Sequence, residues 1–217
     1  MSASDQELTV AEVAGGLAVA GLALPDAEVG ALTRFLALLA RWNRVYNLTG
    51  IRDSTELVAR HLVESLALKP YLRGHRIADV GSGAGLPGLP LAIVEPEREF
   101  TLIESRAKRV RFLRHVIGEL ELMNTIVAHA RAEHLRPDRP FDTVLARAVA
   151  PPAELLAICR PLTAPGSRLL LLTAMHLQEA FRGLASDWEL RSDEAPAAGS
   201  GEPALRSSIV LLERTHG

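Results

Sequence analysis

The stretch that decides the fold is Arg76-Ile-Ala-Asp-Val-Gly-Ser-Gly-Ala-Gly-Leu-Pro-Gly88, an apolar run followed by four glycines within eight residues. Glycine lets the chain turn sharply and lets backbone N–H groups approach a ligand with no Cβ in the way. Pro87 and Pro90 suit the first turn of a helix that follows such a loop. A glycine loop between a first strand and a helix lies at the carboxyl edge of an open α/β sheet, where nucleotides bind. The sequence therefore predicts a nucleotide-binding α/β domain.

The residues around this loop fit the same fold class. After Tyr71 short apolar runs alternate with helical stretches, which is typical of a mainly parallel sheet with helices on its faces. We expect strands at residues 76–80, 100–104, 125–128, 143–147, 169–173 and 209–214. We expect helices at residues 89–94, 107–120, 152–160 and 176–184, and a surface loop at 195–203.

The first 70 residues have a helical pattern. Apolar residues recur every three or four positions in residues 28–46, and again in residues 54–68, where Asp53 or Ser54 is the expected N-cap and Pro70 ends the helix. The sequence thus predicts a helical N-terminal extension at residues 1–70 and an α/β domain at residues 71–217.

Composition excludes several classes of protein. The chain has 217 residues, 48% of them hydrophobic and 23% charged, as in ordinary globular proteins. Its lone cysteine, Cys159, excludes an intramolecular disulfide, and residues 1–10 are polar and acidic, so we expect a cytoplasmic protein. No apolar run approaches the roughly 20 residues that span a bilayer. No cluster of Cys and His has metal-ligand spacing, so we expect no metal.

The net charge of −2 hides an uneven distribution. Residues 1–40 carry five acidic side chains against Arg34, whereas residues 41–60 have a net charge of +2 and residues 104–115 of +4. Arginine accounts for 22 of the 24 basic residues, and its guanidinium suits phosphate contacts and stacking. The two basic blocks are therefore candidate sites for an anionic partner.

Two nucleotide ligands fit the glycine loop. The Gly83-Ala-Gly85-Leu-Pro-Gly88 stretch matches the dinucleotide fingerprint, and Glu104 follows where a carboxylate accepts hydrogen bonds from ribose, which fits NAD. Three features favour S-adenosylmethionine. Asp79 precedes the loop and can face a ligand ammonium group, helices precede the motif, and residues 141–147 form a fourth strand that leads into a possible substrate site.

A set of motifs in order carries a family resemblance. They are Arg41-Trp-Asn-Arg-Val-Tyr-Asn-Leu-Thr49, Arg60-His61 with Ser65, the glycine loop, Lys108-Arg-Val-Arg-Phe-Leu113, Arg131-Ala-Glu133 and Leu145-Ala-Arg147-Ala. Together they resemble the RsmG (GidB) family, bacterial methyltransferases that modify a guanine N7 of 16S, small-subunit ribosomal RNA. The resemblance covers roughly residues 30 to 175. It implies a class I methyltransferase fold with a seven-stranded, mostly parallel sheet and one antiparallel strand, S-adenosylmethionine as cofactor, and ribosomal RNA or the small-subunit particle as partner.

The resemblance also assigns site residues. It places the cofactor on Gly81, Leu86, Ala132, Glu133 and Arg147, with Gly83 and Gly85 in the same loop; methyltransferases in general add Asp79 for the methionine end and Glu104 for the ribose. The candidate RNA contacts are Arg41, Arg44, Asn47, Arg60, Arg106 and Arg109. Two departures from the family stand out, since Glu64 replaces an aspartate of many relatives and Leu172-Thr-Ala-Met175 replaces a Lys-Gly pair.

The target atom explains why no catalytic base is expected. Guanine N7 is a lone-pair acceptor with no proton to lose, so alignment with the sulfonium methyl supplies catalysis. We expect Arg147 to position the reactants, with His61 as a further candidate for contact with RNA or for bracing the pocket. Cys159 lies in an apolar helix pattern, which predicts a buried structural thiol. The Ala150-Pro-Pro-Ala153 stretch lacks the Asn or Asp and the aromatic residue usual in amino-group methyltransferases.

Several interpretations stay open from the sequence. Trp42 and Tyr46 continue the apolar stripe of their helix, which favours core packing for both, and a solvated position is expected for His115. An NAD-dependent oxidoreductase would need a Tyr-Lys or His-Arg pair after the loop, and no tyrosine follows Tyr71. A non-catalytic module that binds S-adenosylmethionine is a second alternative. We expect a monomer.

Overall fold

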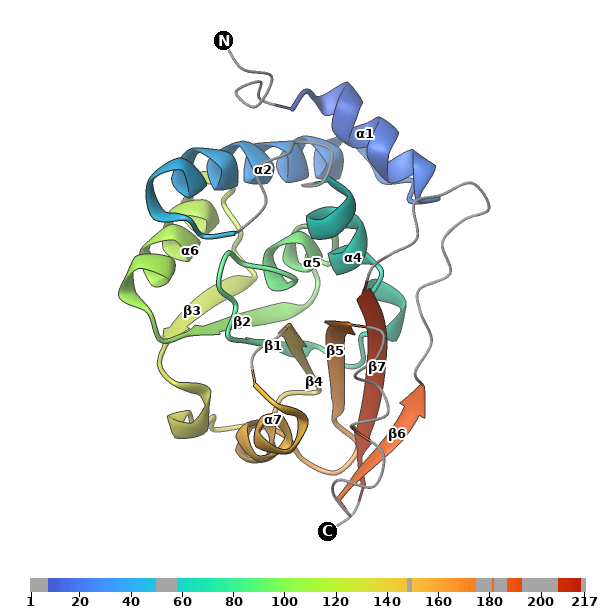
Figure 1. Cartoon of the computed structure of the whole chain (residues 1–217), viewed down its shortest axis with the longest axis vertical. Coiled ribbons are helices and arrows are strands. Elements are labelled where there is room, and N and C mark those ends of the chain that lie inside the picture. Colours follow the sequence, from blue (N-terminus) through green and yellow to red (C-terminus); the bar gives the residue numbers. More distant parts are fainter. Residues whose placement is uncertain are drawn as a thin grey trace.

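The structure is a computed structural model that describes residues 8–49, 58–147, 150–174, 181, 187–192 and 207–215. Within these residues a seven-stranded sheet has the order β3-β2-β1-β4-β5-β7-β6 (Figure 1). Its strands are β1 (Arg76–Val80), β2 (Glu99–Glu104), β3 (Thr125–His129), β4 (Thr143–Arg147), β5 (Arg168–Ala174), β6 (Trp188–Ser192) and β7 (Ser207–Arg214). Strand β7 is antiparallel to both neighbours and the other pairs are parallel. The predicted sheet with one antiparallel strand is confirmed.

Helices cover both faces of the sheet (Figure 1). On one face α5 (Gly88–Val94) and α6 (Ala107–Glu119) pack against the sheet, and the π-helical turn η2 (Val58–Val63) and α4 (Glu64–Leu66) belong to the same buried cluster. Helices α1 (Val10–Val19) and α2 (Asp26–Tyr46) form an outer layer, in which α2 contacts α5 and α6, and α1 contacts α2 and η2. The other face packs against α7 (Pro152–Cys159). Three 3₁₀ turns, η3 (Lys69–Tyr71), η4 (Ala132–His134) and η5 (Arg160–Leu162), lie in the connections.

Alternation along the strands builds these two cores. Strand β5 is apolar throughout, and successive side chains point to opposite faces. Leu170 and Leu172 accordingly belong to the cluster under α2 and α5, whereas Leu169 and Leu171 belong to the cluster under α7. A strand that is buried on both faces reads as a continuous apolar run, which is why the sequence pattern identifies it.

Helix α2 forms along the predicted apolar stripe and starts two residues earlier than predicted. Acidic residues in the first turn of α2 stabilise the helix, because they lie at the positive, amino end of its dipole. Asn47 ends the helix in the left-handed conformation, with φ of 49°. Trp42 is half-buried, with its ring centroid 5.5 Å from that of Phe112 on α6. Core packing is wrong for Tyr46, the last residue of α2, which is 41% exposed.

Other predicted elements differ in detail. The helix expected at residues 54–68 is described from Val58, as η2 and then α4, and its expected caps at residues 53 and 54 lie outside the described residues. Except for Phe181, so do the helix expected at 176–184 and the loop at 195–203. Strand β6 has no counterpart among the strands expected from the pattern.

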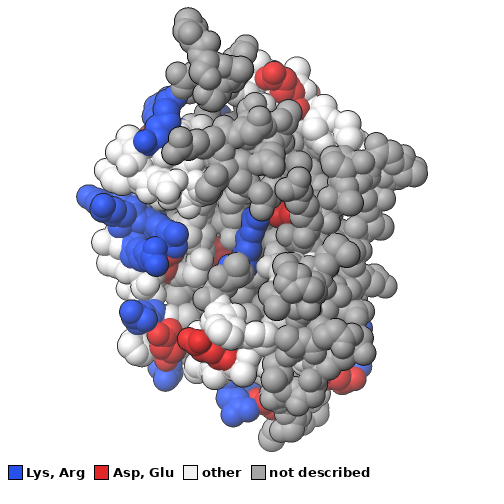
Figure 2. All heavy atoms as spheres, in the orientation of Figure 1, with Lys and Arg blue, Asp and Glu red and all other residues white. Residues whose placement is uncertain are grey.

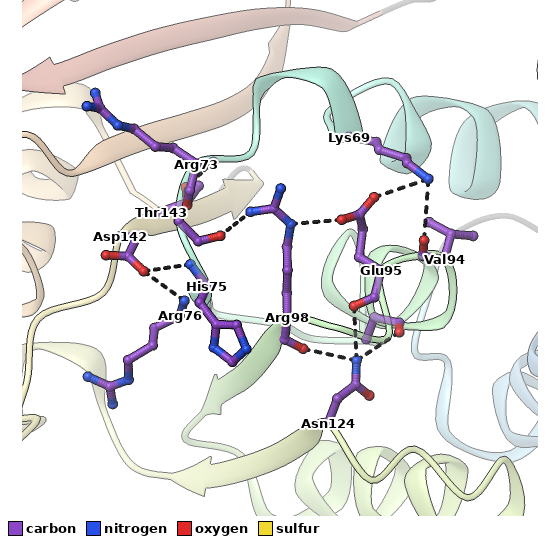
Figure 3. A network of polar contacts seen from close by, with 12 residues as sticks. Lys69, Arg73, His75, Arg76, Val94, Glu95, Arg98, Asn124, Asp142 and Thr143 are labelled. Carbon is purple, nitrogen blue, oxygen red and sulfur yellow. Dashed lines mark hydrogen bonds and ion pairs between the residues drawn. The ribbon is translucent and has the colours of Figure 1, made fainter.

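A polar network ties the amino edge of the sheet together (Figure 3). Glu95 pairs with Lys69 at 3.1 Å and with Arg98 at 2.8 Å. Asp142 accepts hydrogen bonds from the backbone N–H groups of His75 and Arg76, at 2.8 and 2.9 Å, where β1 begins. These contacts fix the amino ends of the strands and leave the opposite, carboxyl edge to the glycine loop.

Among the described residues, no helix is both long enough and apolar enough to cross a membrane.

Candidate active site

The glycine loop joins β1 to α5 and is anchored to β2. The N–H groups of Gly81 and Ser82 both donate to the carbonyl oxygen of Ile103, at 2.9 and 3.1 Å. Gly85 has φ of +81°, and a Cβ built there would lie 2.2 Å from Cδ1 of Leu89, so only glycine fits. The loop is therefore a fixed turn at the carboxyl edge of β1.

Asp79 lies directly under the loop and is 1% exposed. Its Oδ2 accepts a 3.2 Å hydrogen bond from the N–H of Gly88, whereas its Oδ1 is buried with no hydrogen-bond partner among the described residues. Burial, reinforced by the nearby charge of Glu104, raises the pKa of Asp79 to about 7, against the opposing effects of the hydrogen bonds and of Arg147. A buried carboxylate oxygen without a partner is rare in folded proteins and indicates a place for a ligand donor.

Glu104 ends β2 on the other side of the loop. Its Oε2 accepts a 3.0 Å hydrogen bond from the N–H of Gly83 and its Oε1 a 2.8 Å bond from the N–H of Arg106. The guanidinium of Arg109 lies 3.6 Å from Oε2. Each carboxylate oxygen can accept more than one hydrogen bond, so the side chain of Glu104 retains capacity for ribose hydroxyls.

Arg147 ends β4, the strand beside β1, and its side chain is 21% exposed. Its Nη2 lies 2.9 Å from Oε2 of Glu64 on α4, a carboxylate with 1% relative exposure. The guanidinium also lowers the pKa of Asp79, which places the two groups in one electrostatic cluster. Arg147 is thus held at the carboxyl edge of the sheet.

The remaining cofactor candidates surround the same edge. Leu86 and Ala132 are each 7% exposed, Leu86 in the glycine loop and Ala132 in η4 after β3. Glu133 is exposed and lies 3.5 Å from Arg131. His61 is 3% exposed in η2, which favours its bracing role over a surface contact with RNA. The structure therefore gathers residues from β1, β2, η4 and β4 at one edge.

The candidate RNA residues divide into groups. Arg41, Arg44, Asn47 and Arg106 are exposed; Arg109 lies instead beside Glu104 at the glycine loop; and the side chain of Arg60 is outside the described part of the chain. Lys and Arg side chains gather on the left of Figure 2, over the region of α6 in Figure 1. The exposed basic residues of α6 and its N-cap are Arg106, Lys108, Arg111 and Arg114.

His115 departs from its expected solvated position. It is half-buried, and its ring centroid lies 5.6 Å from that of Trp42. Lys108, on the same helix, lies over the exposed ring of Tyr46 at 5.8 Å. Aromatic residues of α2 therefore join the basic face of α6 on the surface.

Cys159 is the last residue of α7, where its side chain is buried in the core with no exposed surface. Burial raises its pKa to about 12, so the thiolate does not form near neutral pH. The expectation of a buried structural thiol is confirmed.

Sequence reasoning missed the role of Glu64 as the partner of Arg147. The two residues are 83 positions apart, and the sequence showed Glu64 only as a departure from the family. The sequence offered one weak signal for this role: Glu64 is a carboxylate inside a helical stretch whose other residues are mostly apolar, and a buried carboxylate needs a partner.

Comparison with known proteins identifies the family. The family model described as GidB, rRNA small subunit methyltransferase G, matches residues 28–202. The chain belongs to this family. The ribosomal RNA small subunit methyltransferase G of Idiomarina loihiensis is 39% identical over 204 residues, covering 94% of this chain and 98% of that protein. The protein of the same name from Xanthomonas campestris pv. campestris is 42% identical over 202 residues, covering 93% of each chain.

Solved structures outside the rRNA small subunit methyltransferase G family share the fold. Magnesium protoporphyrin IX methyltransferase from Synechocystis, solved with S-adenosylmethionine, superposes with a TM-score of 0.58 at 18% identity, covering 89% of this chain and 99% of that one. The ribosomal protein L11 methylase of Lactobacillus delbrueckii gives a TM-score of 0.55 at 12% identity, covering 77% and 81%. The predicted class I methyltransferase is confirmed, and these relatives give no support to an NAD oxidoreductase or a non-catalytic module.

Proposed function

We propose that this protein transfers the methyl group of S-adenosylmethionine to the N7 of a guanine in 16S ribosomal RNA. The observation that carries the proposal is Oδ1 of Asp79, a buried carboxylate oxygen without a partner among the described residues, under the glycine loop of a chain of this family. The ammonium group of the cofactor is the donor that such an oxygen lacks.

The residues at the carboxyl edge fit the parts of this cofactor. Asp79 would hold the methionine end and Glu104 the ribose, with Gly81, Gly83, Gly85 and Leu86 forming the turn against which the cofactor lies. Ala132 and Glu133 follow β3, where backbone groups reach an adenine edge. Arg147 would meet the methionine end from β4, the strand next to Asp79. When bound, the cofactor supplies a methyl group on a positively charged sulfur.

The chemistry then needs orientation and no base from the chain. The lone pair of guanine N7 forms the new N–C bond as the C–S bond breaks, and no proton leaves. Positive charge passes from sulfur to the guanine ring. Holding the three atoms in line can contribute roughly 7 to 11 kcal/mol in favourable cases. The rigid loop, Glu104 and the Arg147 side chain held by Glu64 would provide that alignment.

Two other target atoms fit the chain less well. Methylation of a cytosine carbon needs a cysteine nucleophile, and the sole cysteine is buried at the end of α7 with a pKa raised to about 12. Methylation of an exocyclic amine usually involves an Asn or Asp with an aromatic residue after β4, where this chain has Ala150-Pro-Pro-Ala153. Both arguments favour a ring nitrogen.

We propose that the RNA approaches over α6 and the end of α2. The exposed arginines and Lys108 there offer phosphate contacts, and Tyr46 offers a ring for an unpaired base. With a ribosomal target, the protein would act in the cytoplasm on the small subunit or its RNA. A monomer suffices for this arrangement, and size-exclusion chromatography with light scattering checks that state.

The function is tested by methyl transfer from labelled S-adenosylmethionine to 16S RNA and to small-subunit particles that lack the modification. Chain cleavage at 7-methylguanine then maps the label. Transfer to a single guanine is expected with at least one of the two substrates, and Cys159→Ala is expected to retain it. Transfer to no substrate, or label on a cytosine or an amino group, contradicts the proposal. Calorimetry with NAD as the competing ligand is expected to show no binding.

A further inference from the structure

The segment from His61 to Leu66 carries polar side chains into the interior. All six of its residues are buried, and they include His61, Glu64 and Ser65. The hydroxyl of Ser65 donates to the carbonyl of His61, so this side chain is satisfied within the segment. The side chain of Glu64 instead contacts Arg147 at the end of β4, which is a different part of the fold.

A buried charge pair needs a reason beyond stability. Removing two charges from water costs free energy that their attraction often fails to recover, and apolar residues of similar size are commonly as stabilising. The Glu64–Arg147 pair, with 2.9 Å between Oε2 and Nη2, has a fully buried carboxylate and a mostly buried guanidinium. The pair lies at the carboxyl edge of the sheet, beside Asp79, rather than in the apolar core between α2 and β1.

The geometry also fixes which way an arginine points. A free arginine side chain has several rotatable bonds, and ordering it on ligand binding lowers affinity. A carboxylate at hydrogen-bond distance removes that freedom before the ligand arrives. At the opposite, amino edge of the sheet, the partly buried carboxylate of Glu95 pairs with Lys69 and Arg98, away from the glycine loop (Figure 3).

We propose that Glu64 is a positioning residue of the cofactor site: it fixes the guanidinium of Arg147 for the methionine end of S-adenosylmethionine. The helical extension thereby completes a site whose other groups come from the α/β domain. This inference rests on the proposed function, because it takes Arg147 as a cofactor ligand.

A double-mutant cycle on the full-length protein tests it. Glu64→Gln, Arg147→Gln and the double variant are compared by calorimetry with S-adenosylmethionine, by kcat and KM for methyl transfer, and by thermal unfolding without ligand. Glu64→Gln and Arg147→Gln are each expected to weaken cofactor binding about tenfold, and the double variant no more than Arg147→Gln alone, because coupled residues do not add. Glu95→Gln is the matched control and is expected to lower the unfolding temperature without changing cofactor affinity.

Particular outcomes overturn the proposal. Cofactor affinity of Glu64→Gln equal to that of the wild type, or losses that multiply in the double variant, show that Glu64 does not act through Arg147. If Glu64→Gln does not fold, Glu64→Asp replaces it, since the charge stays but is withdrawn by one methylene. Its expected loss of about threefold must vanish in the Arg147→Gln background, as coupling requires; an equal loss in both backgrounds refutes the inference.

The same experiment separates this inference from the proposed function. If the wild type methylates guanine N7 and Arg147→Gln binds the cofactor as tightly as the wild type, the proposed roles of Arg147 and Glu64 are wrong and the proposed function stands. If the wild type neither binds S-adenosylmethionine nor transfers a methyl group, the inference and the proposed function are both wrong.

Discussion

At the scale of single residues, the buried carboxyl group of Asp79 lowers the stability of the free protein but is suited to binding the cofactor. Its carboxyl group is buried, so the folded protein holds a proton on it up to pH about 7, whereas the unfolded chain releases that proton near its ordinary value of 3.8. The contribution of this group to stability therefore falls as pH rises through that window and stays low above it. A ligand ammonium group reverses the penalty, because it pairs with the ionised form.

Asp79→Asn is accordingly expected to stabilise the free protein while weakening cofactor binding. The gain in unfolding free energy should grow between about pH 4 and pH 7, level off above that, and reach about 4 kcal/mol at most, since one pKa unit corresponds to ~1.4 kcal/mol. Cofactor affinity of the wild type should rise through pH 7, and that of the variant should stay low and flat. Denaturant unfolding and calorimetry at several pH values measure both. A stability difference that does not change with pH contradicts the assignment.

Gly88 places a second constraint on the site. A Cβ built there would lie 2.5 Å from Cδ2 of Leu102 and 2.7 Å from Oδ2 of Asp79. Gly88→Ala should therefore destabilise the fold by ~1–3 kcal/mol, as overpacking does, and weaken cofactor binding by displacing Asp79.

Gly118 is the matched control, because it lies in α6 with nothing within 4 Å of the built Cβ. Gly118→Ala should stabilise the protein by ~0.5–1 kcal/mol through helix propensity and leave cofactor affinity unchanged. Urea unfolding and calorimetry compare the pair. Equal effects of the two substitutions would show that the close approach at Gly88 has no consequence.

At the scale of secondary-structure elements, α6 carries the clearest test of RNA binding. Three exposed basic residues, Lys108, Arg111 and Arg114, lie on its outer face. Replacing all three by Gln should weaken binding to small-subunit RNA and lower the slope of log affinity against log salt by about 2, at ~0.7 to 0.9 per lost phosphate contact. Filter binding over a range of salt concentrations measures this.

A basic residue at the far edge of the sheet provides the control for α6. Arg191 on β6 is half exposed and pairs with Glu213 at 3.1 Å. Arg191→Gln should leave both RNA affinity and the salt slope as in the wild type. If the triple variant of α6 behaves like Arg191→Gln, the RNA binds to another face.

The elements also show which parts of the fold the sequence could predict. Strands β1 and β4 have the predicted bounds, because apolar runs between turn signals are unambiguous there. Strand β6 was not predicted, since Trp188-Glu-Leu-Arg-Ser192 at the edge of the sheet alternates apolar and polar residues over only its first four positions. The π-helical geometry of η2 was also not predicted, because no periodic pattern in the sequence distinguishes it from an α-helix.

The candidate site was predictable only where it follows the topology of the sheet. Glu104 and Arg147 end their strands and Asp79 is the last residue but one of β1, so the rule that ligands bind at the carboxyl edge places the three together. The pairing of Arg147 with Glu64 depends on how α4 packs over that edge, which no local pattern encodes. Arg109 was predicted as an RNA contact among the basic residues of α6, but it lies on the side of the helix that faces Glu104.

At the scale of the whole molecule, the helical extension and the sheet share one hydrophobic core. Leu32, Phe35 and Leu36 of α2 belong to the same buried cluster as Ile77 of β1 and Leu89 of α5. The boundary predicted at residue 70 stays a prediction, but the helical extension has its buried residues in a cluster that it shares with the sheet. We therefore expect residues 1–70 and 71–217 to unfold together in one cooperative transition.

The two tryptophans of the chain allow this expectation to be measured directly. Trp42 lies on α2 against Phe112, and Trp188 lies 7% exposed on β6 at the opposite edge of the sheet. Trp42→Phe and Trp188→Phe each leave one fluorescent reporter, and their urea midpoints should each coincide with the loss of far-UV circular dichroism in the same variant. Leu36→Ala, which truncates a fully buried side chain, should lower both midpoints together by ~2–5 kcal/mol of unfolding free energy. If the Trp42 signal instead changed at lower urea than the Trp188 signal, the extension would be a separate unit, and Glu64 could leave Arg147 without the sheet unfolding.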